Sequence, residues 1–265
     1  MSWIDTHVHF DAPEFDATRA DDWARARDAG VLAQVVPAVA PFNFNTVRDM
    51  ADVYVGTAYA LGIHPMYVNP LDPDGAIAAL RVALEANIHD SRLVAVGEVG
   101  LDGFIKTIDQ DKQLHFFQAQ LKLAREFDLP VLLHVRHAQD TVIKYVRQFN
   151  VRQGIAHAFN GSFSQAEAYM KQGLHLGFGG MMTFSRSLQI RRLATELPIE
   201  RMVLETDAPD MSPSWAYKEN NYSHYLPRIA ESLMDLRGLD AVALSEHMRR
   251  NTLQVLPRLA AMIEV

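Results

Sequence analysis

Short apolar runs alternate along the chain with longer segments in which apolar residues recur at helical spacing. Eight runs have the length and composition of buried strands: residues 3–7, 31–39, 54–63, 92–100, 129–135, 152–159, 174–180 and 201–207. Segment 111–128 predicts an amphipathic helix, with apolar positions at Leu114, Phe117, Leu121 and Ala124. Segments 139–149 and 164–173 predict two more helices, and the second ends on Gly173, a residue suited to a helix C-terminus.

Eight strands that alternate with helices over 265 residues correspond to about 33 residues for each strand–helix unit. This arrangement predicts the α/β class and a (β/α)₈ TIM barrel. A doubly wound open sheet is the competing fold, but eight strands are many for it, and no Gly-x-Gly-x-x-Gly sequence follows the first strand. Because no linker, low-complexity tract or internal repeat divides the chain, we expect a single domain over residues 1–265.

Ionisable residues recur where the predicted strands end, and active sites of barrels lie at the carboxyl ends of the strands. On the first strand, Asp5, His7 and His9 occupy alternate positions, so their side chains are expected on one face. The other candidates at this end of the barrel are Glu98, His134, His157 and Asp207. The two histidines and these four residues would suit two divalent ions bridged by one carboxylate, which its position predicts to be Glu98.

Each of these residues has a simpler explanation on its own. A single histidine at a strand end is more often a hydrogen-bonded core residue than a ligand, and Asp207 could cap the next helix. Six such residues at the same end of different strands favour a metal site over six separate coincidences. The other histidines are expected to be structural: His89, His115, His137, His175, His224 and His247.

Composition narrows the chemistry further. The chain has no cysteine, which excludes disulfides, thiolate ligands and cysteine nucleophiles. A nitrogen and oxygen ligand set fits Zn²⁺, Mn²⁺ or Mg²⁺. The formal charge of -7 argues against a broad basic surface for duplex DNA, but it leaves open a nucleic-acid substrate whose phosphates meet metal ions locally.

No targeting segment or membrane span is apparent in the sequence. Met1 leads directly into a predicted strand, and the apolar runs are shorter than the ~18 residues that a membrane span requires. We therefore expect a cytoplasmic enzyme, without a membrane partner and without an obligatory protein partner.

A series of motifs resembles the TatD family of metal-dependent hydrolases, which belongs to the amidohydrolase-like barrels. The motifs follow the family's order and extend the resemblance from residue 3 to about residue 255: DTHVHFD (5–11), LGIHP (61–65), VGEVGLD (96–102), LPVLLHVRHA (129–138), HAFNGS (157–162), LGFGG (176–180) and LETDAPD (204–210). The resemblance implies two divalent ions. It assigns His7, His9, Glu98 and Asp207 to one ion, and Glu98, His134 and His157 to the other.

The resemblance also implies roles beyond the ligands. Asp207 would orient the attacking water and carry its proton, and Glu205 would orient a ligand or water. His64 is expected near the substrate, with a structural turn as the alternative. Arg136 is a candidate phosphate clamp, with a surface salt bridge as its alternative.

The 217–227 loop departs from the family pattern. Asn221 keeps the family's asparagine and is expected at the substrate, but Ser223 replaces a proline. Elsewhere, Asn160 stands where serine or threonine is usual. The loop's tyrosines could stack bases, although packing on the barrel rim is the commoner role for such residues: Tyr217, Tyr222 and Tyr225.

For activity, the resemblance implies a deoxyribonuclease of the 3'–5' exonuclease type, acting on the phosphodiester bonds of single-stranded nucleic acid. One alternative is a hydrolase of another small ester, a lactone or an amide, or a base deaminase. Residue 98 is glutamate, whereas many related lactonases carry a lysine there. The other alternative is a metal-binding protein without catalytic activity.

Overall fold

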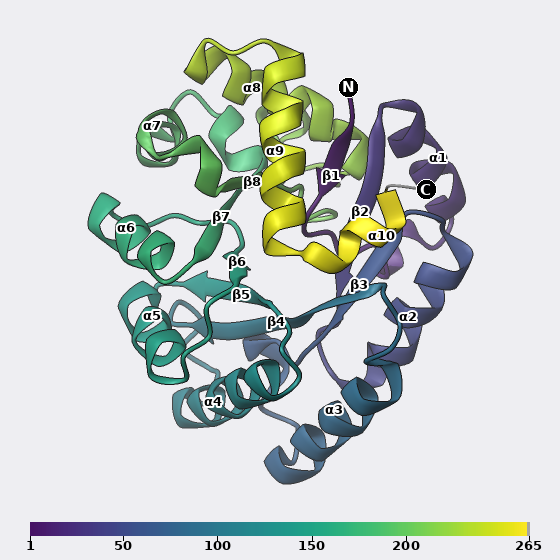
Figure 1. The fold of residues 1–265 in the computed structure, drawn as a ribbon, viewed down its shortest axis with the longest axis vertical. Coiled ribbons are helices and arrows are strands. Elements are labelled where there is room, and N and C mark those ends of the chain that lie inside the picture. Colours follow the sequence, from purple (N-terminus) through teal and green to yellow (C-terminus); the bar gives the residue numbers. More distant parts are fainter. Residues whose placement is uncertain (264–265) are drawn as a thin grey trace.

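Eight parallel strands follow one another around a barrel in the computed structural model, which describes residues 1–263 (Figure 1). The strands are β1 (Trp3–Asp5), β2 (Val31–Pro37), β3 (Thr57–Leu61), β4 (Leu93–Asp102), β5 (Val131–Arg136), β6 (Gly154–Ala156), β7 (Leu174–Phe178) and β8 (Met202–Leu204). Each strand pairs with the next, and the Thr6 amide donates to the Leu204 carbonyl over 3.1 Å to join the last strand to the first. The predicted (β/α)₈ barrel is confirmed.

Helices cover the outside of the barrel between successive strands (Figure 1). They are α1 (Arg19–Asp28), α2 (Phe44–Val53), α3 (Pro73–Asn87), α4 (Gln110–Glu126), α5 (Gln139–Gln148), α6 (Phe163–Lys171), α7 (Leu188–Glu196), α8 (Leu226–Arg237), α9 (Ala241–Val255) and α10 (Ala260–Ile263). Within residues 1–263, none of them combines the length and the apolarity that crossing a bilayer requires.

The core has two parts. The larger apolar cluster fills the space between strands and helices, and a second cluster includes Ile4, Ala33 and Val203 from different strands. The C-terminal segment joins this second cluster through Val255, Leu256 and Leu259. Figure 1 shows this part of the chain, in yellow, crossing in front of the barrel. Arg258 fastens it to the loop before β4 by donating to the carbonyls of Ile88 and Asp90 over 2.6 and 2.8 Å. The amino-terminal end of the barrel is therefore closed.

Several strands are shorter than the apolar runs that predicted them. β1 ends at Asp5, β6 ends at Ala156 and β8 ends at Leu204, although the runs extend two or three residues further. Residues 6–7, 157–159 and 205–207 instead form loops at the carboxyl end of the barrel, and all of them except Ala158 and Asp207 are buried. Most of the candidate site residues consequently lie just after strands rather than on them.

Helix α4 buries three of the four apolar positions predicted for it, namely Phe117, Leu121 and Ala124, and it also buries two glutamines that the pattern did not indicate. Leu114 is only half-buried, while Gln113 and Gln120 are fully buried. Gln113 accepts from the Asp102 amide over 2.8 Å and donates to the Asp102 carbonyl over 3.2 Å. Gln120 makes the same pair of bonds with Ile63, over 2.6 and 3.0 Å. Because the side-chain amides of Gln113 and Gln120 have hydrogen-bond partners, their burial carries little penalty. These bonds also fix the backbone where β3 and β4 end.

Gly173 occupies a position that excludes a side chain. Its φ of +95° lies in the left-handed region, and a Cβ there would come within 2.2 Å of the Arg152 carbonyl oxygen. The predicted helix end at this glycine is confirmed, because α6 stops at Lys171 and the chain turns directly into β7.

Burial of His175 on β7 links stability to pH. The side chain is almost fully buried, and this burial, with the nearby charge of Arg201, lowers its pKa from 6.5 to about 4. Between these pH values the unfolded chain binds a proton that the folded protein does not bind. The contribution of this group to the free energy of unfolding therefore falls as the pH falls from about 6.5 to about 4.

Replacing His175 by leucine removes this proton uptake. Between about pH 7.5 and about pH 5, we expect the wild type to lose about 2 kcal/mol more stability than His175→Leu, as measured by urea unfolding. His115→Leu is the matched control, because His115 is exposed on α4. Equal pH dependence in the wild type and His175→Leu would contradict this account.

Candidate active site

The side chains predicted as metal ligands converge at the carboxyl end of the barrel: His7, His9, Glu98, His134, His157 and Asp207. Glu98 lies on β4 and His134 on β5, and the other four lie in the loops that follow β1, β6 and β8. Glu98 is buried in the middle of this group and contacts four of its histidines.

One oxygen of Glu98 faces a first set of candidate metal ligands, which are His7, His9 and Asp207. Its Oε2 atom lies 3.0 Å from His7 Nε2 and 3.3 Å from His9 Nε2. Asp207 Oδ1 lies 3.6 Å from His7 Nε2 and 3.7 Å from His9 Nε2. Four ligand atoms at about 2.0–2.2 Å from a tetrahedral ion would lie about 3.3–3.6 Å apart. The donor types and their spacing therefore fit a divalent metal ion.

The other oxygen of Glu98 belongs to a second set. Its Oε1 atom lies 2.9 Å from His134 Nδ1, 3.2 Å from His64 Nε2 and 3.5 Å from His157 Nε2. His64, which the sequence placed near the substrate, is instead buried with its Nε2 atom 3.0 Å from His134 Nδ1. The structure thus adds a histidine to the group around Glu98, and it also stacks His157 on His7 with ring centroids 4.0 Å apart.

The pKa values of this group reflect one buried negative charge among imidazoles. Burial opposes ionisation of Glu98, but the neighbouring histidines, led by His64 and His7, hold its pKa well below the usual range. Burial also opposes protonation of His9 and His157, yet nearby carboxylates raise their pKa values to about 9 and about 10. Burial lowers the pKa of His7 and lowers that of His64 to about 4, so these two rings favour the neutral form that binds metal. The positive charge that Glu98 requires is therefore supplied by only part of the group, and a bound cation meets the same requirement.

Asp102, at the end of β4, supports the second set and was not among the predicted residues. Its Oδ2 atom lies 3.2 Å from His134 Nε2, so the opposite ring nitrogen faces Glu98. Burial opposes ionisation of Asp102, but the His134 contact and two backbone amides lower its pKa. Orienting a ligating histidine through its second nitrogen is common at metal centres. The VGLD sequence at a strand end was the signal that could have identified it.

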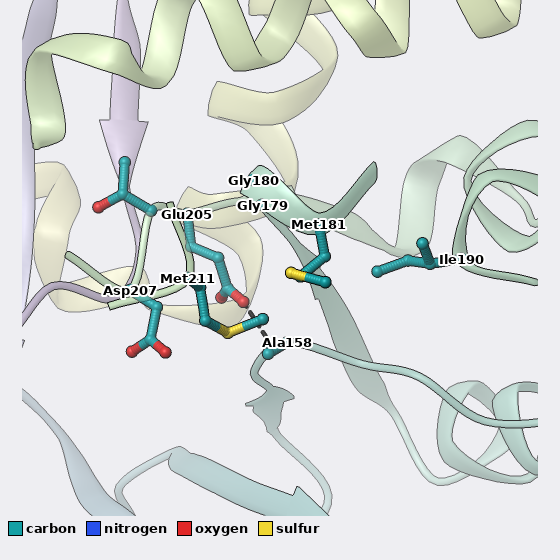
Figure 2. Close-up of a pocket in the computed structure, with 9 residues that line it drawn as sticks. Ala158, Gly179, Gly180, Met181, Ile190, Glu205, Asp207 and Met211 are labelled. Carbon is teal, nitrogen blue, oxygen red and sulfur yellow. Dashed lines mark hydrogen bonds between the residues drawn. The ribbon is translucent and has the colours of Figure 1, made fainter. Parts of the chain in front are cut away.

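Glu205 holds the loop that carries His157. It is buried, it accepts a hydrogen bond from the Ala158 amide, and its Oε1 atom lies 3.4 Å from His157 Nδ1. Figure 2 shows Glu205 directed at Ala158 beside a cavity of about 10 Å³ that Met181 and Met211 help to line. This position suits the orienting role predicted for Glu205.

Asp5 does not share the face of His7 and His9 as predicted, because β1 ends at Asp5 and the regular alternation ends with it. It is fully buried and accepts hydrogen bonds from the Thr206 amide and hydroxyl over 2.9 and 2.6 Å. The Ser223 hydroxyl donates to it over 2.8 Å. Asp5 therefore ties the end of β1 to the loop that bears Asp207.

Asn221 is placed differently from the substrate contact that the sequence predicted. It is fully buried, and its Nδ2 atom donates to the Thr206 carbonyl over 2.7 Å. Its oxygen accepts from the Tyr222 amide over 2.9 Å. Its polar atoms are thus occupied by backbone, and the residue supports the loop after β8.

The other predicted substrate residues lie at the rim. Arg136 is about half-exposed, with its guanidinium 3.9 Å from the Phe104 ring centroid and 3.8 Å from Asp102. Among the loop tyrosines, Tyr217 is exposed, whereas Tyr222 and Tyr225 are partly buried and pack edge to face.

Comparison with known proteins places this site in a family. The chain matches the family described as TatD related DNase over residues 4–257. The uncharacterized metal-dependent hydrolase YjjV of Escherichia coli is 36% identical over 251 residues, which cover 94% of this chain and 96% of that protein. The crystal structure of YjjV has a TM-score of 0.92 with this chain at 35% identity, covering 96% of this chain and 98% of the other. The 3'-5' ssDNA/RNA exonuclease TatD of a Pantoea strain is 31% identical over 95% of this chain and 98% of its own.

An eight-stranded barrel with histidine and carboxylate clusters at its strand ends, together with these relatives, defines a metal-dependent hydrolase. The chain belongs to the TatD family.

Removing the Ser223 hydroxyl tests the link between β1 and the Asp207 loop. Burial raises the pKa of Asp5 to about 7, and the Ser223 bond favours its ionised form. We expect Ser223→Ala to lose about 1–2 kcal/mol of stability in urea unfolding, with a larger loss at about pH 8 than at about pH 6. Ser214→Ala, at an exposed position, is the control. Unchanged stability at both pH values would show that the bond contributes nothing.

Proposed function

We propose that this protein is a phosphodiesterase that removes nucleotides from the 3' end of single-stranded DNA and uses two divalent ions, Zn²⁺, Mg²⁺ or Mn²⁺. The observation that carries the proposal is the division of Glu98: one oxygen faces His7 and His9, and the other faces His134 and His157. A single carboxylate between two ligand sets suits a pair of ions about 3.5–4 Å apart. The exonuclease name of the Pantoea relative supports the choice of substrate.

Each protein group has a defined task in this reaction. Divalent ions in such a site acidify water and neutralise the charge that develops on a phosphoryl group. Asp207 Oδ1 lies 3.6 Å from His7 Nε2 and 3.7 Å from His9 Nε2, and its side chain is partly exposed, so it can accept a proton from the attacking water and return it to the leaving oxygen. The loop holds Asp207 at a φ of +59° through the bond from its amide to the His7 carbonyl, over 2.9 Å. Glu205 keeps the His157 loop in place.

A location in the cytoplasm and action without an obligatory protein partner belong to the same proposal. Two outcomes would replace the exonuclease proposal. The first is hydrolysis of another ester, a lactone or an amide, and the second is metal binding without turnover.

The first experiment is hydrolysis of 3'-end-labelled single-stranded DNA by chelator-stripped protein, with Mg²⁺, Mn²⁺ or Zn²⁺ added back. We expect shortening of the strand only with metal. Asp207→Asn should be slower by at least about 100-fold, since it removes both a ligand charge and the proton acceptor. Asp235→Asn, on the exposed face of α8, should retain wild-type activity. If a metal-loaded wild type leaves DNA intact but hydrolyses a lactone or another ester, the exonuclease proposal fails.

Metal content separates the roles of Glu98 and His134. Glu98→Gln should lose affinity at both sets, because it removes the shared charge, whereas His134→Gln should lose about one of two bound equivalents. Elemental analysis after equilibrium dialysis measures the bound metal, and circular dichroism checks that each variant is folded. Loss of a single equivalent from Glu98→Gln would contradict the bridging role.

A further inference from the structure

Exposed aromatic side chains of residues 1–263 gather at one end of the barrel. They are Phe42, Tyr67, Phe104 and Tyr217. Each lies in a loop that follows a strand, after β2, β3, β4 and β8 respectively, and therefore at the mouth where the ligand sets converge. The other exposed large apolar side chains in this range are aliphatic. An exposed aromatic ring forgoes the hydrophobic stabilisation that burial would give it. Exposed rings at the mouth of a site can instead bind flat ligands by stacking.

Phe104 and Arg136 form a stacked pair at this mouth. The guanidinium carbon lies 3.9 Å from the ring centroid, which is the separation of direct face contact. The phenyl ring remains 52% exposed and the arginine side chain 46% exposed, so the pair presents a free surface. Aromatic rings and guanidinium planes are the two kinds of surface on which proteins stack unpaired bases.

The pair is tied to the second ligand set through Asp102. One oxygen of this carboxylate accepts from the Phe104 and Ile105 amides over 2.8 and 3.0 Å. The other oxygen lies 3.2 Å from His134 Nε2 and 3.8 Å from Arg136. A ligand stacked on the pair would therefore sit at a fixed place beside the ions.

Local charge around the pair suits a nucleotide. Lys106 and His137 are exposed in the same two loops, and the His137 ring lies 5.4 Å from that of Phe104. Lys106 and Arg136 place two positive charges at this side of the mouth, in a chain with a formal charge of -7, and this local charge favours approach of a polyanion.

We propose that the Phe104–Arg136 pair is a base-stacking subsite for a nucleotide next to the bond that is cut. This inference rests on the proposed exonuclease function. It also changes the role of Arg136, because the plane of its guanidinium group, and not only its charge, contacts the substrate.

Across the mouth, exposed Tyr217 packs edge to face on Phe184 with centroids 5.9 Å apart, and Lys218 lies over the Tyr217 ring.

Binding of nuclease-resistant phosphorothioate strands tests the subsite without requiring turnover. Fluorescence anisotropy with Mg²⁺ present compares a thymidine strand with one that is abasic at its two 3'-terminal positions. We expect the wild type to bind the thymidine strand about tenfold more tightly. Phe104→Leu should remove most of this difference, and so should Arg136→Lys, which keeps the charge but loses the plane.

Phe149→Leu is the matched control, because Phe149 pairs with Lys122 at 5.7 Å just after α5, where the chain returns toward the amino-terminal end of the barrel. It should bind both strands like the wild type. Equal weakening of both strands by Phe104→Leu, or no change, would overturn the subsite, and wild-type binding by Arg136→Lys would assign Arg136 to a phosphate instead. If the wild type binds neither strand and leaves DNA uncut, the exonuclease function is overturned as well. If Phe104→Leu cleaves DNA and keeps the wild-type preference for the thymidine strand over the abasic strand, the subsite alone is overturned.

Discussion

The ionised carboxylate of Glu98 is buried inside the protein, and its charge imposes a requirement on everything around it. An unpaired carboxylate in such a place would be strongly unfavourable, so positive charge must lie within contact distance. Histidines from β5 and from the loops after β1, β3 and β6 meet Glu98 from different sides. Because they come from elements far apart in the sequence, the barrel must be closed before the charge is satisfied. Fold and metal chemistry are thereby coupled through one side chain.

A layer of neutral and acidic groups then holds those histidines in place. Asp102 sets the ring of His134, and Gln113 holds the backbone of Asp102 from helix α4. Gln120, two turns further along the same helix, holds Ile63, whose neighbour is His64. The geometry of the ligands thus depends on an outer helix that contributes no ligand itself. Substituting these glutamines with apolar residues of similar size would leave strand-end backbone groups without partners.

The fold and the grouping of the six candidate ligands at one end of the barrel follow from the sequence because both depend on local patterns. Glu98 and His134 lie in the second half of apolar runs whose number and spacing predict the barrel, and the barrel rule places such residues toward one mouth. The position of His64 depends on how closely the ends of β3 and β5 approach each other on the two sides of β4, and that distance is not encoded in either run. Asn221 and Asp5 were placed wrongly for a related reason: their partners are backbone groups of a loop after β8, whose path depends on tertiary contacts. The predicted strands extended past the observed ends of β1, β6 and β8 because most of the loop residues that follow are buried, as the residues on the strands are.

The C-terminal segment closes the far end of the barrel with Val255, Leu256 and Leu259, which pack on the interior side chains. The interior of the barrel is therefore accessible only from the carboxyl end of its strands. A polymer cannot be threaded through the molecule, so substrate must arrive, and product must depart, over the same rim. Any movement of the protein along a polymer would therefore have to take place across the rim, because no path leads through the barrel axis.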